Sequence, residues 1–173
     1  FSDEVENFKE DCCLVTIKNK VGFVTLQGDW IAAPMYEAGG SFSGGYAYLA
    51  QAGKYGFIDK SGEFVIPMRY SNAKDFHPFY GLACVAENGS WGVIDVRGNY
   101  VVPAAYDNVV VTADGYICAE KDGKFGIFSS SGRVIYPVEC DRIEHDAEKD
   151  LFRFGTVNGR LNGQRIRIDK QGN

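Results

Sequence analysis

The chain has 173 residues, of which 45% are hydrophobic and 24% charged, a composition typical of a soluble globular protein. Its formal net charge is −5, whereas a protein that binds the nucleic-acid backbone needs a basic stripe. No apolar run approaches the ~20 residues of a membrane-spanning helix. We therefore expect neither a nucleic-acid partner nor membrane insertion, and we interpret Arg160, Arg165 and Arg167 as a solvated strand face.

The five cysteines lean toward a reducing compartment such as the cytoplasm. Their number is odd and no C-x-x-C pair occurs, which argues against a disulfide framework and against a zinc site. Because the chain begins at Phe1, a signal peptide could already have been removed, and export stays open. The cysteines are Cys12, Cys13, Cys84, Cys118 and Cys140.

An aromatic or apolar residue followed by glycine recurs along the chain at steps of 34, 36 and 34 residues. Three further columns keep these steps: a turn glycine, a proline and an aromatic residue. A fixed period of this length indicates a repeat architecture. The pairs are Val21-Gly22, Tyr55-Gly56, Trp91-Gly92 and Phe125-Gly126; the turn glycines are Gly28, Gly62, Gly98 and Gly132; the prolines are Pro34 (one place late), Pro67, Pro103 and Pro137; and the aromatic column is Tyr36, Tyr70, Tyr106 and, in the fourth copy, Cys140.

The period divides one domain, residues 1–173, into four full repeats and a degenerate fifth. The fifth copy keeps a match from Ile168 to Gly172 but has Arg165-Ile166 in place of the aromatic–glycine pair. Terminal repeats of a stacked array are often atypical because one side faces water. The repeats span approximately 8–41, 42–75, 76–110, 111–144 and 145–173.

Each repeat is predicted to open with a β-hairpin and to continue into a third short strand. In the third copy, Asn88-Gly89 joins two apolar runs, and both residues accept the positive φ of a type I′ turn. Gly98 is expected to supply φ > 0 in the next turn, and Pro103 to end the third strand because it cannot donate to a ladder. The turns at the Asn88-Gly89 position in the other copies are Lys18-Asn19, Ala52-Gly53 and Asp122-Gly123.

These units predict an all-β fold of short three-stranded meanders stacked in an open array. A single sheet of ~34 residues cannot bury its own apolar face, but stacked neighbours can. The alternative is a small propeller-like closed ring, which a fourth strand around residues 106–111 would favour. The unlike end copies favour the open array. The expected inward-facing residues include Ala47, Leu49, Ala83, Val85, Ile117 and Ala119, and the only candidate helix is Glu144 to Leu151.

The third copy resembles the bacterial WG repeat, also called the KWG repeat. The resemblance rests on Ser90-Trp91-Gly92-Val93-Ile94-Asp95, Gly98, Val102-Pro103 and Tyr106, and the second copy fits nearly as well. It covers Phe8 to about Ile143 in four copies. The resemblance implies a β-rich repeat with a binding role and brings no catalytic residues with it.

Candidate reactive residues have structural explanations. Asp59, Asp95 and Asp169 share a column with Thr25 and Ser129, which indicates side chains that accept backbone N–H groups in a turn. His77 and His145 fall in connectors outside any metal or catalytic motif. Cys84 and Cys118 share a column with Tyr48 and Leu14, which indicates apolar packing. We therefore expect no enzymatic activity, no metal and no cofactor.

Five aromatic residues crowd the connectors into the second and third repeats. They are expected to pack between repeats or, where exposed, to form a binding surface, because aromatic residues dominate binding hot spots. The function expected is binding of another protein, since stacked repeats present extended surfaces. The alternative is binding of a carbohydrate or cell-envelope polymer. The five residues are Tyr46, Tyr48, Phe76, Phe79 and Tyr80.

Overall fold

The computed structural model describes residues 4–6, 8–140, 142–146, 151–155 and 167–168. Every regular element in this part of the chain is a β-strand, and the strands form five separate antiparallel sheets. The predicted all-β class is confirmed. The candidate helix is wrong: β17 ends at Asp146 and β18 begins at Leu151, with residues 147–150 outside the described part.

Each sheet is a meander of consecutive strands. The first contains β1 (Glu4–Val5), β2 (Cys12–Ile17), β3 (Lys20–Thr25) and β4 (Trp30–Tyr36); the second β5 (Ala38–Gly39), β6 (Tyr46–Gln51), β7 (Lys54–Asp59) and β8 (Phe64–Tyr70); the third β9 (Asn72–Ala73), β10 (Leu82–Glu87), β11 (Ser90–Asp95) and β12 (Tyr100–Tyr106); the fourth β13 (Asn108–Val111), β14 (Ile117–Lys121), β15 (Lys124–Phe128) and β16 (Val134–Cys140); the fifth β17 (Arg142–Asp146), β18 (Leu151–Gly155) and β19 (Arg167–Ile168). The three predicted strands are present in each full repeat, and a short leading strand joins them. The expectation that Pro103 ends the third strand is wrong, because β12 continues to Tyr106.

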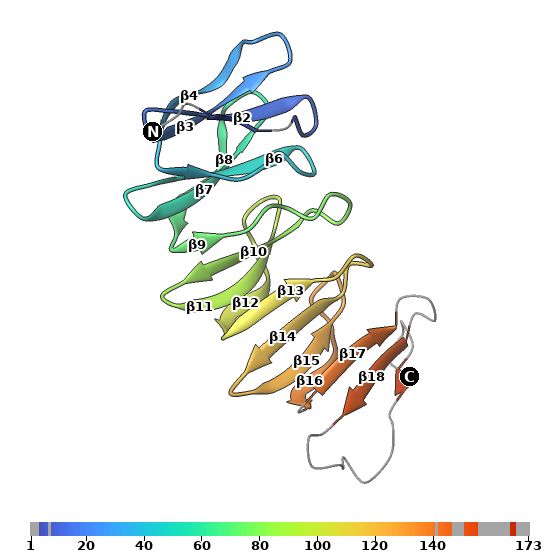
Figure 1. Cartoon of the computed structure of the whole chain (residues 1–173). Helices are drawn as coiled ribbons and strands as arrows, with labels where there is room; N and C mark the ends of the chain where they lie inside the picture. Colours follow the sequence, from blue (N-terminus) through green and yellow to red (C-terminus); the bar gives the residue numbers. More distant parts are fainter. Residues whose placement is uncertain (1–3, 7, 141, 147–150, 156–166, 169–173) are drawn as a thin grey trace.

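The sheets follow one another as an open array (Figure 1), with the first and fifth sheets at its two ends. Among the described residues, strands pair only within their own sheet, so the first sheet does not pair with the fifth to close a ring. The leading strands that would favour a propeller blade are therefore present in an array that stays open.

The hydrophobic core is divided among the interfaces between neighbouring sheets. Phe57 and Ile66 of the second sheet, for example, pack with Ala83 and Val85 of the third. Six of the residues predicted to face inward, named above, are all at most 1% exposed, which confirms that face of the strands. Val24, which was predicted to face inward with Ile58 and Ile94, is only partly buried. Because each sheet buries its apolar side against the next, no repeat is expected to be stable alone.

A β-bulge explains why the glycine of each aromatic–glycine pair is needed. Trp91 pairs with Tyr106 and Val93 with Val102, so residues 103–105 of β12 lie opposite Gly92 alone. A Cβ on Gly92 would lie 2.7 Å from both the Val102 carbonyl oxygen and the Ala104 nitrogen. The glycine and proline columns thus belong to one structural feature, because the bulge that begins at Pro103 crosses over Gly92.

The turns adopt the predicted backbone. Both central residues of all four hairpin turns have positive φ, from 50° at Lys18 to 84° at Gly89, as type I′ requires. The four turn glycines share φ values between 80° and 89°, which confirms that they have one conformation. A side chain in this region is strained, so glycine is favoured there.

Candidate functional site: a pocket and an aromatic loop

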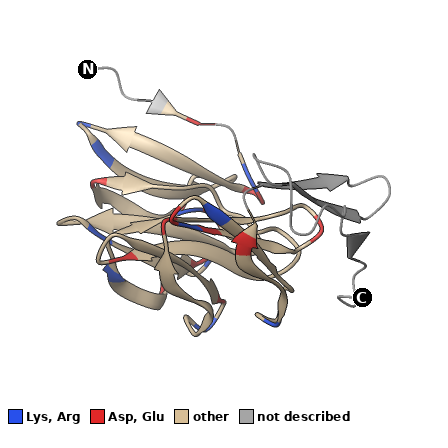
Figure 2. Ribbon diagram, turned by 90° about the horizontal axis from the view of Figure 1, so that it is seen from below, with Lys and Arg blue, Asp and Glu red and all other residues tan. Residues whose placement is uncertain are grey.

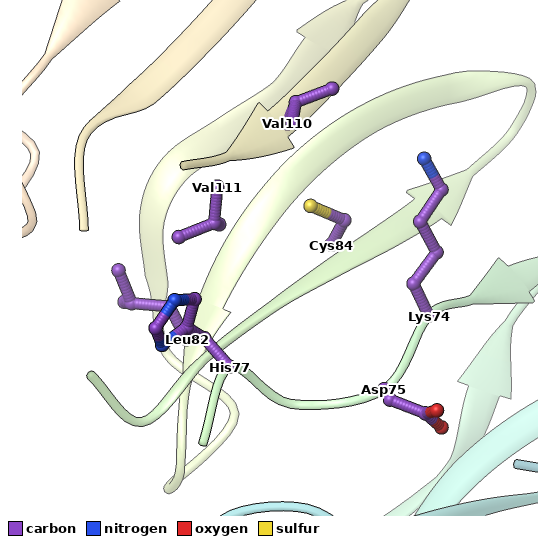
Figure 3. A pocket seen from close by; sticks show the side chains of 7 residues that line it. All are labelled: Lys74, Asp75, His77, Leu82, Cys84, Val110 and Val111. Carbon is purple, nitrogen blue, oxygen red and sulfur yellow. The ribbon is translucent and has the colours of Figure 1, made fainter. Parts of the chain in front are cut away.

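A pocket of about 160 Å³ lies between the third and fourth sheets (Figure 3). One wall comes from β10 and from the connector between β9 and β10, and the other comes from β13. Most of the lining is apolar, with charged groups at the connector. The lining residues are Lys74, Asp75, His77, Leu82, Cys84, Val110 and Val111.

The pocket borders a loop that extends from His77 to Gly81 and is held at several points. The His77 N–H donates to the Leu82 carbonyl (2.7 Å), and the Phe79 N–H donates to His77 Nδ1 (3.2 Å). The Tyr80 ring packs against His77 with 4.9 Å between ring centroids. A Cβ on Gly115 of the fourth repeat would lie only 2.5 Å from Tyr80, so this ring also covers that glycine. The loop is therefore anchored to both repeats.

Phe79 projects from this anchored loop. Its side chain is 86% exposed, and that of Tyr80 is 43% exposed. Val110, which lines the pocket from β13, is 47% exposed. An aromatic residue on a fixed backbone beside an apolar pocket is an arrangement suited to binding another molecule.

The ionisable groups of the pocket do not form a reactive pair in the described part of the chain. Burial raises the pKa of the Cys84 thiol, and the Lys74 ammonium and a backbone hydrogen bond at Val111 offset only part of the rise. Cys84 is therefore a protonated thiol at neutral pH. No hydrogen bond joins it to His77 within this part of the chain.

Asp75 and Lys74 each interact with a residue that does not line the pocket. The Asp75 carboxylate accepts the Ser41 N–H (3.0 Å), and Figure 3 shows it pointing away from Cys84. Neighbouring groups desolvate this carboxyl and raise its pKa, although part of the side chain remains in contact with water. The Lys74 ammonium lies 4.9 Å from the centre of the Trp91 ring, a cation–π contact.

The five predicted aromatic residues do not form one surface. Phe76 is 2% exposed and packs on Phe57, so it follows the expected packing between repeats and does not belong to a binding surface. Tyr46 and Tyr48 are partly buried against the same core. Phe79 and Tyr80 are exposed, and their role in binding stays a prediction. The sequence carried a signal for Phe76, since Phe42 stands 34 residues earlier and is also buried.

The acidic column has the structural role expected of it. Asp59 accepts the backbone N–H groups of Ser61 and Glu63. Asp95 accepts those of Arg97 and Asn99 in the same way, while Thr25 and Ser129 bond to Asp29 and Arg133. Burial raises the pKa of Cys118 to about 11, in keeping with apolar packing.

The remaining candidates come from the C-terminal part of the chain and from its last described strands. His145 belongs to β17, so its placement in a connector is wrong. Arg167 belongs to β19. Asp169, Arg160 and Arg165 lie outside the described residues. Within the described part, no group of three or more His, Cys, Asp or Glu could hold a metal ion, and no helix is long and apolar enough to cross a membrane.

Sequence reasoning missed the lining of the pocket. Lys74 and Val110 belong to different repeats, and only the stacking of the repeats brings them together. A signal existed in the fourth repeat, where the leading strand β13 has four residues and β9 has two. The longer strand places Val110 and Val111 beside the preceding connector.

The comparisons with known proteins agree with the repeat geometry. The family model of the WG containing repeat matches residues 22–55, 55–91 and 91–125. The chain belongs to the WG-repeat family. Each match begins at or next to the position of a bulge-covered glycine, so the WG repeats and the sheets share one period. None of the curated proteins compared with the chain matches it.

Solved structures show the fold alone. A eukaryotic initiation factor superposes with a TM-score of 0.53 at 13% identity, covering 94% of this chain and 54% of that one. Hsv2 from Kluyveromyces lactis superposes with a TM-score of 0.50 at 9% identity, covering 96% of this chain and 62% of that one. The WG-repeat chain therefore spans less than two thirds of the length of these structures.

Proposed function

We propose that this chain is a non-enzymatic WG-repeat module that binds another protein through the pocket and the His77–Gly81 loop. The carrying observation is Phe79, which is 86% exposed on a loop anchored to two repeats. Aromatic residues that lie fixed beside a pocket are typical binding hot spots, because little side-chain entropy is lost on association.

The pocket favours one apolar side chain of the partner. Its volume of about 160 Å³ suits a single aliphatic or aromatic group, and Leu82, Val110 and Val111 provide apolar walls. The partner would place that group between repeats while Phe79 packs on its surface. Lys74 at the rim offers a cation for a partner carboxylate or carbonyl oxygen.

The alternatives are a carbohydrate partner and an enzyme. Sugar-binding aromatic residues are expected to be flanked by Asn, Asp or Gln, whereas Phe79 stands between Pro78 and Tyr80. An enzyme would need an activated nucleophile or acid. The raised pKa of the Cys84 thiol supports the non-enzymatic proposal. The dispersed charges of the described array (Figure 2) give no support to a nucleic-acid partner.

Affinity purification with the chain as bait tests this proposal, followed by titration of the captured protein. Phe79→Ala should weaken binding about tenfold or more, as loss of a hot-spot aromatic does. Met35→Ala is the matched control, because Met35 is 54% exposed on the distant strand β4. Equal binding by both variants would contradict the proposal, and binding of a glycan that depends on Phe79 would favour the carbohydrate alternative.

A further inference from the structure

A phenylalanine of the second repeat and one of the third each insert into the repeat before them. Phe42 packs edge-on against Phe23 of the first repeat, with 5.0 Å between ring centroids. Phe76 packs in the same way against Phe57 of the second repeat, at 4.8 Å. Phe42 and Phe76 are 3% and 2% exposed. Phe8 holds the same column in the first repeat, and it is 45% exposed.

The turn glycines show the same difference between inner and first repeats. A Cβ on Gly62 would overlap the Ile31 carbonyl oxygen of the preceding repeat, and one on Gly132 would overlap that of Val101. A Cβ on Gly98 would lie 3.5 Å from the Ile66 side chain. Gly28 has the same backbone conformation, yet a Cβ there would have nothing within 4 Å. The turn glycines of the inner repeats thus lie close to the preceding repeat, whereas nothing occupies the equivalent space beside Gly28.

The aromatic residues that begin the third strands form another such column. Phe64 lies 6.1 Å from Tyr36 of the preceding repeat, and Tyr100 lies 6.4 Å from Tyr70, both edge-on. Trp30 occupies this column in the first repeat and is 50% exposed. Phe8, Gly28 and Trp30 therefore present one face of the first sheet, here called the leading face. The first sheet lies at the N-terminal end of the array (Figure 1).

We propose that the leading face binds a further WG repeat, packed as each repeat packs on the next. That repeat would supply an aromatic residue in the Phe23 and Phe57 column, and a tyrosine in the Tyr36 and Tyr70 column. The three residue columns fix this partner, because each has a known neighbour at the inner interfaces. An unrelated apolar surface is not expected to complement Phe8, Gly28 and Trp30 at the same time.

A second copy of the chain does not fit the leading face as well. Its fourth repeat offers Ile127 and Cys140 where the first and second repeats have a phenylalanine and a tyrosine. The fifth sheet also contacts the fourth, since β17 lies against β15. The proposed occupant is therefore a WG repeat of the second-repeat type. The leading face lies in the first sheet, so this inference stands independently of the pocket between the third and fourth sheets.

The test adds a repeat in register. Residues 38–71 are copied ahead of Glu4 in place of residues 1–3. One residue then separates the added tyrosine from the next leading strand, as it does after Tyr36 and Tyr70. Both the parent chain and the extended chain carry Trp91→Phe, which leaves Trp30 as the only tryptophan. Trp30 emission should shift to shorter wavelength, its quenching by acrylamide should fall, and the thermal midpoint should rise.

A matched control carries the same added copy with its own Phe57 and Tyr70 changed to alanine. It should restore the exposed emission of Trp30. A second measurement uses Phe8→Ala. This substitution should lower the thermal midpoint only slightly in the parent chain. In the extended chain it should lower the midpoint nearly as much as Phe42→Ala does.

Three results would overturn the inference. The first is an added copy that leaves Trp30 as accessible to acrylamide as before, whether or not the copy folds. The second is Phe8→Ala having the same effect in both chains. The third is protection of Trp30 in the parent chain that grows with protein concentration, which would assign the leading face to a second copy.

Discussion

The hairpin turns of this molecule share one backbone conformation, whereas the connectors into the hairpins differ from repeat to repeat. All four hairpin turns, from Lys18-Asn19 to Asp122-Gly123, have two central residues with positive φ. The connectors into the hairpins differ: β5 and β6 are joined through Gly44-Gly45, β9 and β10 through the longer loop that bears Phe79, and β13 and β14 through a turn closed by Thr112. Uniform turns keep the period of the stack, whereas one of the variable connectors carries the exposed aromatic residues Phe79 and Tyr80.

The largest expected effect concerns the bulge that every full repeat shares. Gly92→Ala should destabilise the protein by about 3–5 kcal/mol, because the new methyl group would meet the backbone of β12 at 2.7 Å. Gly89→Ala is the control: its φ is +84° but nothing lies within 4 Å, so only about 1–2 kcal/mol of backbone strain is expected. Urea denaturation measures both, and equal losses would contradict the role of the bulge.

The second prediction concerns the aromatic residue that precedes this glycine. Trp91, Tyr55 and Phe125 occupy equivalent positions and are partly buried. Trp91→Ala should therefore cost about 3 kcal/mol, near the lower end of the 3–5 kcal/mol typical of a large aromatic residue. Trp91→Phe, which introduces the residue type that the fourth repeat has at Phe125, should cost less than about 1.5 kcal/mol. A loss below about 1 kcal/mol for Trp91→Ala, as at an ordinary surface site, would count against the prediction.

The stack could be predicted from the sequence because turn residues and alternating apolar residues reflect the local backbone conformation. Positive φ selects Asn and Gly in the hairpin turns, and alternation places Ala83 and Val85 inside. The two-residue leading strands were not predicted, because two residues such as Ala38–Gly39 cannot show alternation. The longer β13 falls within the fourth strand that was considered around residues 106–111. The link between Gly92 and Pro103 was hidden as well, since a bulge appears only in the pairing of two strands.

The candidate site was predicted only in part. Phe79 and Tyr80 stood out as aromatic residues in a connector, but their exposure differs from that of Phe76, only three residues before Phe79. Burial of Phe76 depends on Phe57 in the repeat before it. The pocket likewise depends on Lys74 and Val110 meeting across an interface. Contacts of this kind need the relative placement of repeats, which periodicity alone does not supply.

The third prediction compares two neighbours in the variable connector. Tyr80→Ala should destabilise the protein by about 1 kcal/mol, because its ring packs on His77 and covers Gly115. Phe79→Ala should change stability by less than about 0.5 kcal/mol, because that side chain is 86% exposed. Thermal denaturation of both variants measures the difference. A larger loss for Phe79→Ala would mean that this residue holds the loop and is not free for a partner.

The smallest expected effect is the pH dependence of one turn. The hydroxyl of Ser61 donates to the Asp59 carboxylate and, with backbone N–H groups of the turn, holds the pKa of Asp59 below its ordinary value of 3.8. Folding therefore favours the ionised form. The resulting stability is present above that ordinary value and is lost as the pH falls from it through the lower folded pKa.

Asp59→Asn keeps an acceptor oxygen but removes the charge, so the variant should melt slightly below the parent at pH 7 and together with it at about pH 2. Ser129 fills the same place in the fourth repeat, where its uncharged hydroxyl accepts the Arg133 N–H. Ser129→Ala should therefore lower the melting temperature by an amount that does not change with the Asp59 titration. Melting curves from pH 7 to about pH 2 separate the two cases. A deficit in Asp59→Asn that stayed constant over that range would mean that the turn uses this side chain for shape and not for charge.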